Sequence, residues 1–432
     1  MLSSRPVLTL SALIIFLLSL FFFGFRPPSY YLTRPGVISS EFPDFGRFRS
    51  LETLHPEQFP LYDVDRRVII VGDIHGMFEQ FQRLLAKISY NPSSDVLISV
   101  GDIVAKGPHS GSMQVLDLMA SHNVTAVRGN HDQQVIEWRT WIEWVHSLPG
   151  GSRWLSTANE RWRKAQRHGA DDVDKWVAEQ VKHDRRHSQW WKRIPKKWTL
   201  FGDHYKIAEE MTDEQYVYMV QRPLRIHVPH AHTFIVHAGI LASDPEYPSG
   251  HKRQPLAHIP PLPEDNQSLD KSDKISILRR LQEQAILSDV PQNTVPWNTL
   301  NMRGILSDHS VTRKQEGTPW AELYNKNMKR CAGFDAKEKS SLPCYSSTVI
   351  YGHAASRGLD INRWSIGLDS GCVYKRHMSA LVLGGKLAQQ SLTSDLEDRF
   401  DEEAIDIDGR IVSSKIQFGD SGRGKLYRVT CK

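Results

Sequence analysis

Aspartate, asparagine and histidine side chains stand in short motifs that could together bind metal ions. Three motifs contain glycine: Gly72-Asp73-Ile74-His75-Gly76, Gly101-Asp102-Ile103-Val104 and Gly129-Asn130-His131-Asp132. With two late histidines, the six candidate ligands are Asp73, His75, Asp102, Asn130, His237 and His353. Oxygen and imidazole donors without thiolates suit two small cations such as zinc, manganese or iron. Because paired cations usually serve hydrolysis of phosphate esters or phosphoanhydrides, the pattern predicts a hydrolase.

The candidate ligands follow segments that have the pattern of buried β-strands. Residues 68–71, 96–100 and 124–128 are expected strands, and each leads into Gly-Asp or Gly-Asn. Helical spacing over 77–88 and 113–121 separates them, which indicates βαβ units and a mainly parallel sheet. Such sheets place ligand sites at the carboxyl ends of their strands, so the motifs should converge on one edge. Strands over 233–236 and 348–351 lead to the late histidines, and those over 364–368 and 379–383 are expected in a second sheet.

The chain length of 432 residues allows one large catalytic domain with insertions. The net charge of +5 is too small to indicate a class of partner. We expect the catalytic domain over residues 61–432, with inserts at about 138–230 and about 241–346.

The first insert is helical, basic and rich in tryptophan, with nine of the chain's twelve tryptophans between Trp138 and Trp198. Three interpretations stay open. Its lysines and arginines could guide a long polyanion, its aromatic rings could stack nucleic-acid bases, or the tryptophans could pack a helical cap while the charges face water.

The N-terminus predicts attachment to a membrane. After a tail of residues 1–6, residues 7–25 carry no charge and are just long enough to cross a bilayer. Arg26-Pro27-Pro28 follows without a small-residue cleavage site, which favours a retained transmembrane signal anchor. Residues 26–60 would then be a linker to a catalytic domain in a lumen.

The four cysteines are compatible with a lumenal compartment. Cys331 and Cys344 could form a disulfide or remain free thiols, and Cys372 is expected to be a buried small residue. Two glycosylation sequons occur, of which Asn266 is the better candidate.

The motifs GDIVAKGP, HAGI and LDSGC resemble those of calcineurin-like metallophosphoesterases of the phosphoprotein-phosphatase type. Within that family the chain is similar to the branch of symmetrical diadenosine-tetraphosphate hydrolases. With an N-terminal anchor, it is most similar to the fungal vacuolar zinc-dependent endopolyphosphatases. The resemblance implies an α/β fold, a two-sheet β-sandwich flanked by helices, to which this chain adds the tryptophan-rich insert and the transmembrane helix.

The resemblance also assigns roles to the ligands. Asp73 and His75 would bind the first metal, Asp102 would bridge both metals, and the second metal would be completed by Asn130, His237 and His353. Two divalent ions are implied, with zinc expected and manganese, cobalt or iron as alternatives.

Further roles follow from the same resemblance. Catalysis would involve His131 as general acid, with Asp102 as the bridging ligand. Lys106, Arg128 and Arg303 would balance the charge of the substrate phosphate.

The chain departs from the family in two places. Protein serine/threonine phosphatases carry an acid and an arginine where this chain has Ala105 and Lys106. Without that acid, either another carboxylate orients His131 or the general acid is held less precisely, and a phosphoprotein substrate is disfavoured. Many metallophosphoesterases also have a histidine at the position of Ala355, so the first metal should keep more water ligands.

These observations predict a vacuolar, membrane-anchored hydrolase that cleaves inorganic polyphosphate internally. One alternative is a diadenosine-polyphosphate or mRNA-cap hydrolase, whose bases would stack on the tryptophans. A protein phosphatase and an inactive phosphate-binding membrane protein are further alternatives. The oligomeric state is left open.

Overall fold

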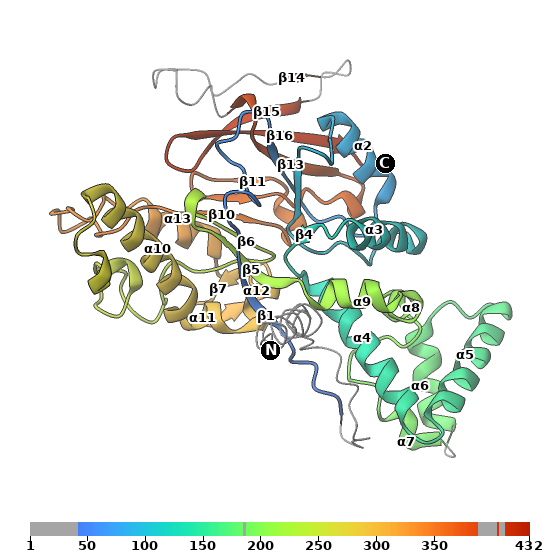
Figure 1. The fold of residues 1–432 in the computed structure, drawn as a ribbon. Helices are drawn as coiled ribbons and strands as arrows, with labels where there is room; N and C mark the ends of the chain where they lie inside the picture. The colour runs from blue at the N-terminus through green and yellow to red at the C-terminus, as the bar shows by residue number, and fades with distance from the viewer. Residues whose placement is uncertain (1–41, 185–186, 388–403, 406–410) are drawn as a thin grey trace, which may run out of the picture.

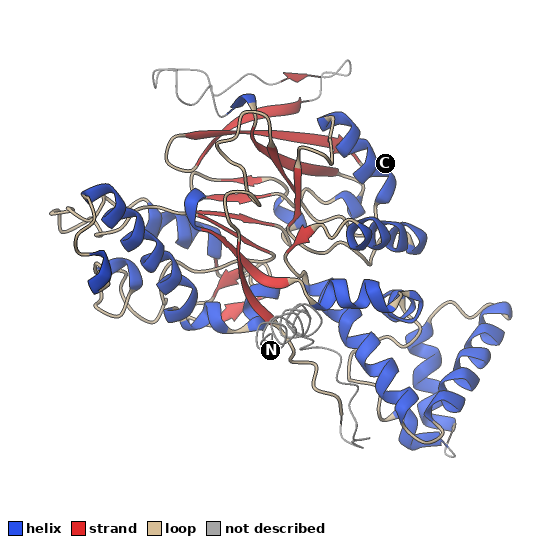
Figure 2. Ribbon diagram, in the orientation of Figure 1, coloured by secondary structure: helices blue, strands red, loops and turns tan. Residues whose placement is uncertain are grey.

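Two β-sheets pack face to face in the computed structural model, with helices covering their outer sides (Figures 1 and 2). The structure describes residues 42–184, 187–387, 404–405 and 411–432. One sheet has the strand order β1-β5-β6-β10-β12-β11 and the other β14-β15-β16-β13-β2-β3-β4. The expected α/β fold with a two-sheet β-sandwich is therefore present, and both sheets are mixed.

The seven-stranded sheet contains the first three motif strands. Its parallel members are β2 (Arg67–Val71), β3 (Val96–Ser99) and β4 (Thr125–Ala126). The remaining, antiparallel members are β13 (His377–Gly384), β14 (Ala404–Ile405), β15 (Ile411–Phe418) and β16 (Gly422–Thr430). Residues 379–383 were expected in the other sheet, but β13 pairs directly with β2.

Alternation along β2 explains why both faces of this sheet are covered. Val68 and Ile70 belong to the core between the two sheets, because successive side chains of a strand point to opposite faces. Ile69 and Val71 instead pack with helices α2 (Phe78–Ile88) and α3 (His109–Ser121).

The six-stranded sheet supplies the strands that precede the two late histidines. Its strands are β1 (Arg49–Thr53), β5 (Pro223–Val228), β6 (Thr233–Val236), β10 (Thr348–Tyr351), β11 (Asp360–Ile361) and β12 (Ser365–Gly367). Strand β10 runs parallel to both β6 and β12, so these strands end at the same edge.

The N-terminal predictions meet the structure only in part. The linker expected over 26–60 is wrong for its last residues: β1 pairs in parallel with β5, and Leu54 and Phe59 are buried. Strand β1 has few apolar residues, and charged and proline residues flank them, so the sequence showed no clear strand pattern there. The predicted anchor at 7–25 and residues 26–41 lie outside the described residues. No helix in the described part of the chain is long and apolar enough to cross a membrane.

The first insert folds as a helical cap, which we define as residues 130–220. It comprises α4 (Asn130–Ser147), α5 (Gly151–Arg167), α6 (Val173–His183), α7 (Ser188–Trp191), α8 (Asp203–Glu210) and α9 (Asp213–Val220). The helices end before the predicted boundary of 230, because β5 already belongs to the sheet.

Strand β5 was not recognised in the sequence because it contains polar residues. These residues are buried and satisfied: Arg225 donates to the Leu287 and Asn293 carbonyls, and His227 pairs with Glu283.

The tryptophans of the cap form its core. Eight of the nine are buried: Trp138, Trp141, Trp144, Trp154, Trp162, Trp176, Trp190 and Trp191. They contact one another, as in the stacked rings of Trp154 and Trp190, whose centroids are 5.5 Å apart. Of the three interpretations, packing of a helical cap agrees with this arrangement, whereas buried rings offer no surface on which a base could stack.

The second insert covers the other flank of the six-stranded sheet (Figure 1). It holds the helices α10 (Lys271–Asp289), α11 (Pro291–Thr294), α12 (Pro296–Asn301) and α13 (Trp320–Met328). A small sheet of β7 (Gly304–Ile305), β8 (Val311–Thr312) and β9 (Thr318–Pro319) joins them.

All four cysteines form disulfides. Cys331 pairs with Cys344, one of the two states considered. The expectation for Cys372 was incomplete: it is buried, but it is bonded to Cys431, 59 residues later. That partner lies at the end of β16, which pairs with β13, and no sequence spacing indicates this proximity.

Candidate metal centre

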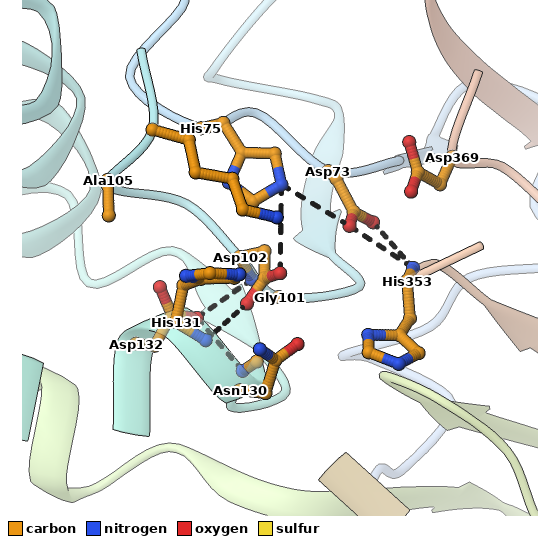
Figure 3. Close-up of polar contacts among 12 residues, drawn as sticks. Asp73, His75, Gly101, Asp102, Ala105, Asn130, His131, Asp132, His353 and Asp369 are labelled. Carbon is orange, nitrogen blue, oxygen red and sulfur yellow. Dashed lines mark hydrogen bonds and ion pairs between the residues drawn. The ribbon is translucent and has the colours of Figure 1, made fainter. Parts of the chain in front are cut away.

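The six predicted ligands come together where the two sheets present the ends of their strands. Figure 3 labels five of them: Asp73, His75, Asp102, Asn130 and His353. Potential ligand atoms of Asp73, His75 and Asp102 lie within 4.8 Å of one another, and so do those of Asp102, His237 and His353. Asp102 is common to both groups. His237 Nε2 is 3.1 Å from the Asn130 amide oxygen and 3.4 Å from Asp102 Oδ2, which adds Asn130 to the second group.

The backbone at the site is shaped for these contacts. His75, Asp102 and His353 have φ values of 48°, 51° and 68°, a left-handed region that non-glycine residues rarely occupy and that is found at functional sites. Gly129 and Gly352 let backbone approach the ligands. A Cβ at Gly129 would lie 2.1 Å from Asp102 Oδ1, and one at Gly352 would lie 2.1 Å from Asp73 Oδ1.

Hydrogen bonds leave one nitrogen of each late histidine available for a cation. His237 donates through Nδ1 to the Val100 carbonyl at 2.9 Å, and His353 donates through Nε2 to the Asn301 carbonyl at 3.2 Å. Metal-binding histidines are usually oriented in this way by a partner of the second nitrogen. His75 has no hydrogen bond at its buried Nδ1 within the described structure.

The charge of the site also fits cations. Burial, and then the nearby Asp369 carboxylate, raise the pKa of Asp73 well above its usual range. Burial opposes the charged form of Asp102 as well, but His237 and His131 outweigh it and the pKa of Asp102 is lowered. Although burial alone would lower it, the Asp102 carboxylate raises the pKa of His237 to about 9. Buried carboxylates that repel one another require compensating positive charge, which divalent ions would supply.

Two further buried carboxylates belong to the site. Asp369, in the LDSGC motif, had no predicted role and lies beside Asp73 (Figure 3). Asp132 accepts the backbone N–H groups of Asp102 at 2.8 Å, Ile103 at 3.0 Å and Gly129 at 2.9 Å. It therefore holds two ligand loops together as a capping residue.

His131 lies next to the two metal groups, but its partner differs from the expectation. Its backbone N–H donates to Asp102 Oδ1 at 2.8 Å, and its ring Nδ1 shares a 2.8 Å hydrogen bond with Nε2 of His204. Of the two possibilities for His131, an orienting carboxylate is not found among the described residues, because the ring bonds to His204. His204 is 73 residues away in the sequence, and no pattern connects the two. Burial, opposed in part by Asp102, lowers the pKa of His131 to about 3; an anionic phosphate beside the ring would raise it again.

The three predicted phosphate-binding cations have different surroundings. Lys106 is exposed, with its ammonium 5.9 Å from the centre of the Tyr374 ring. Arg303 is partly buried and donates to the His353 carbonyl at 3.0 Å.

Arg128 does not fit the predicted phosphate contact. It is 1% exposed and donates to the Val220 carbonyl at 2.5 Å and to Gln133 Oε1 at 2.8 Å. Burial lowers its pKa to about 10. Its guanidinium thus connects α4 to the end of α9.

Two arginines that were not predicted contact the loop that carries His353: Arg357 lies on that loop, and Arg376 precedes β13 and reaches it with its side chain. Arg357 donates to the Arg303 carbonyl at 2.8 Å, and Arg376 donates to the Ala355 carbonyl at 2.7 Å. With Lys106 and Arg303 they form what we call the cationic rim. The LDSGC motif and the sequence around Arg303 pointed to this region of the chain. The sequence could not indicate that the four cationic side chains lie near one another, because they are brought together by the fold.

Comparisons with known proteins agree with this geometry. Residues 66–233 match the family model described as calcineurin-like phosphoesterase, a range that contains four of the six candidate ligands. Serine/threonine-protein phosphatase 1 of Salmonella typhimurium is 37% identical over 91 residues, which are 21% of this chain and 41% of that protein. The symmetrical bis(5'-nucleosyl)-tetraphosphatase of Haemophilus ducreyi is 48% identical over 67 residues, 16% of this chain and 25% of that protein. The chain thus spans less than half the length of these relatives.

A solved structure of a protein provisionally described as a diadenosine tetraphosphatase covers 78% of this chain and 94% of its own. It is 23% identical and superposes with a TM-score of 0.40, too low to bear on function.

The chain contains a calcineurin-like phosphoesterase domain. Members of this family are metal-dependent hydrolases that use two divalent cations, and the two clusters that share Asp102 are able to hold such a pair.

Proposed function

We propose that this chain hydrolyses internal phosphoanhydride bonds of inorganic polyphosphate with two divalent cations, zinc being the first candidate. The cationic rim carries this proposal. Lys106 lies on the loop of Asp102, while Arg303, Arg357 and Arg376 lie on the loop of His353 or bond to the backbone beside it. Positive charge beside the ligands therefore extends beyond what one phosphate needs. A polyphosphate has a negative charge on each unit, and several fixed cations would bind consecutive units.

The ligands divide as the clusters suggest. Asp73 and His75 would hold one cation and Asn130, His237 and His353 the other, with Asp102 shared. When bound, such cations lower the pKa of water and neutralise phosphate charge. His131 would give a proton to the leaving phosphate oxygen as its bond to phosphorus breaks and one water is consumed. Lys106 and Arg303 would orient the chain.

A second candidate is a dinucleoside-polyphosphate or mRNA-cap hydrolase. The observation that favours it is Tyr374, which is 54% exposed and lies against Lys106 at the site. An exposed ring beside a phosphate-binding cation could stack a base. A relative named symmetrical bis(5'-nucleosyl)-tetraphosphatase supports the same candidate.

Other activities have less support. Relatives named serine/threonine phosphatases exist, but Ala105 replaces the acid of those enzymes, which disfavours a phosphoprotein substrate. An inactive phosphate-binding protein would not need six matched ligands. For the cellular setting, we propose a membrane-anchored protein with its catalytic domain in the vacuolar lumen, since two disulfides suit an oxidising compartment.

The test incubates the purified full chain with long-chain polyphosphate, bis(5'-nucleosyl) tetraphosphate and capped RNA in parallel. Zinc, manganese, cobalt and magnesium are added in turn, and the products are sized on a gel. Shortened polyphosphate chains with little free phosphate would establish internal cleavage. An intact polymer together with cleaved dinucleotide or cap would overturn the first candidate in favour of the second. Substitution of Tyr374 by alanine should impair only the nucleotide substrates.

A further inference from the structure

Helix α8 of the cap contacts the active site through two consecutive side chains. His204 Nε2 is 2.8 Å from His131 Nδ1, and the two imidazole rings are stacked with centroids 5.0 Å apart and planes at 19°. The neighbouring residue, Asp203, accepts the backbone N–H of Lys106 at 2.5 Å through Oδ2. Two neighbouring residues of α8 therefore bond to His131, the proposed general acid, and to the backbone of Lys106 in the cationic rim.

The base of α8 is firmly packed. Tyr205, Ile207 and Ala208 are fully buried, and the Tyr205 ring meets Trp138 edge-on at 5.2 Å. Since Trp138 lies on α4, the helix that begins with Asn130 and His131, α4 and α8 present their histidines to each other from one tryptophan core. Such packing restricts the rotamer of His204 and therefore the ring that it contacts.

His204 is the only hydrogen-bond partner of the His131 ring among the described residues. The Asp102 carboxylate accepts the backbone N–H of His131 and not a ring nitrogen. Ala105, fully buried, carries no group that could bond to the ring. The hydrogen bond and the stacking fix both the rotation and the plane of the imidazole, and they leave Nε2 as the nitrogen free to face substrate.

We propose that His204 is a positioning residue, which the cap supplies to hold His131 as proton donor. The inference rests on the proposed phosphohydrolase chemistry but not on polyphosphate as substrate. In the reaction a water oxygen bonds to phosphorus and gives up a proton to solvent while the bond between phosphorus and the leaving oxygen breaks. The proton on His131 Nε2 passes to that leaving oxygen, and the ring is left neutral. His204 keeps its hydrogen bond to Nδ1 throughout. The cap is then part of the catalytic apparatus, because without α8 the ring of His131 loses its hydrogen bond and its stacking partner and keeps only an edge contact with His75.

A first test needs no turnover. Crystal structures of the full chain loaded with zinc are compared for the wild type, His204→Ala and His204→Gln. We expect the His131 ring to be rotated or to occupy several positions in the alanine variant, and to be restored in the glutamine variant, whose amide can replace the hydrogen bond. Both metals should remain bound in elemental analysis. A His131 ring that keeps its orientation in His204→Ala would overturn the proposal.

The second test separates positioning of a proton donor from general damage by the choice of leaving group. p-Nitrophenol leaves without help from an acid, whereas phenol needs a proton. For His204→Ala we expect kcat on phenyl phosphate to fall about 100-fold and kcat on p-nitrophenyl phosphate to fall less than about threefold, as for loss of general acid catalysis. An equal fall on both esters would mean a structural role and would overturn the proposal.

The matched control is His109→Ala, which removes the other histidine that contacts α8, through Glu210 at 2.7 Å, without touching His131. It should leave both rates within about twofold of the wild type, since exposed ion pairs contribute little. The proposed polyphosphate activity and this inference can fail separately: cleavage of the aryl esters with intact polyphosphate rejects the substrate and still tests His204.

Discussion

Asp132 accepts the backbone N–H of Asp102 at 2.8 Å, so a buried carboxylate that binds no metal fixes the loop of the shared ligand. We predict that Asp132→Asn retains the fold but loses metal affinity, because an amide cannot accept all three N–H groups that Asp132 serves. Each lost acceptor would destabilise by about 1–3 kcal/mol. Metal titration by calorimetry, with thermal unfolding, measures both effects. Wild-type metal affinity in the variant would show that the loop does not depend on Asp132.

Asp102→Asn should abolish turnover and reduce the bound metal from two ions per chain. The reason is that Asp102 is the one member common to both ligand clusters, so its substitution weakens both. Elemental analysis and activity are measured on the same preparation. Near-normal activity would contradict the shared-ligand assignment.

His131→Ala should separate catalysis from metal binding. The ring bonds to His204 and meets the His75 ring only edge-on, with centroids 5.4 Å apart. Because it offers neither cluster a ligand atom, two metals should stay bound while turnover falls by about 100-fold or more. Loss of an ion from this variant would instead identify His131 as a ligand.

Arg128 and Arg303 should behave differently although both were predicted to bind phosphate. Arg128→Ala removes a buried guanidinium from the Val220 carbonyl and Gln133, and should lower the free energy of unfolding by about 3 kcal/mol with KM unchanged. Arg303→Ala should mainly raise KM. Denaturant unfolding and steady-state kinetics on both variants decide this, and a raised KM with normal stability for Arg128→Ala would restore its predicted role.

Stability should fall in acid through Glu283, which accepts from His227 and His232 at 2.8 Å each. Burial favours the neutral acid, but these hydrogen bonds outweigh it and lower the pKa of Glu283. Because the folded pKa is the lower one, this contribution is present above the unfolded pKa of about 4.3 and is lost as pH falls below it.

Glu283→Gln should therefore destabilise the protein by about 3 kcal/mol at pH 7, and the difference from wild type should shrink as pH falls below about 4. Thermal unfolding from pH 3 to 7 measures it. The exposed Glu264→Gln serves as control. A difference that is constant with pH would exclude the charged pair as its source.

The ligands could be predicted from sequence because each follows a strand end, where local pattern determines position. Asp73 and Asp102 follow β2 and β3, and because these strands pair in parallel, their ends lie at the same edge of the sheet. His204 and the Cys372–Cys431 bond could not be predicted, since they depend on how α8 and β16 pack against distant elements. Arg128 was misjudged for a related reason: a cation beside a motif resembles a phosphate ligand until its neighbours are known.

Helix α4 gives the cap and the metal centre a common backbone. It begins at Asn130 and His131 and continues, without interruption, to Trp138, Trp141 and Trp144 in the cap core. The cap is consequently not a separate module that could move or be replaced independently of the metal centre. A shift of its aromatic core is transmitted along the rigid helix to a ligand and a proton donor at the other end, so substrate range and catalytic competence must change together when the cap changes.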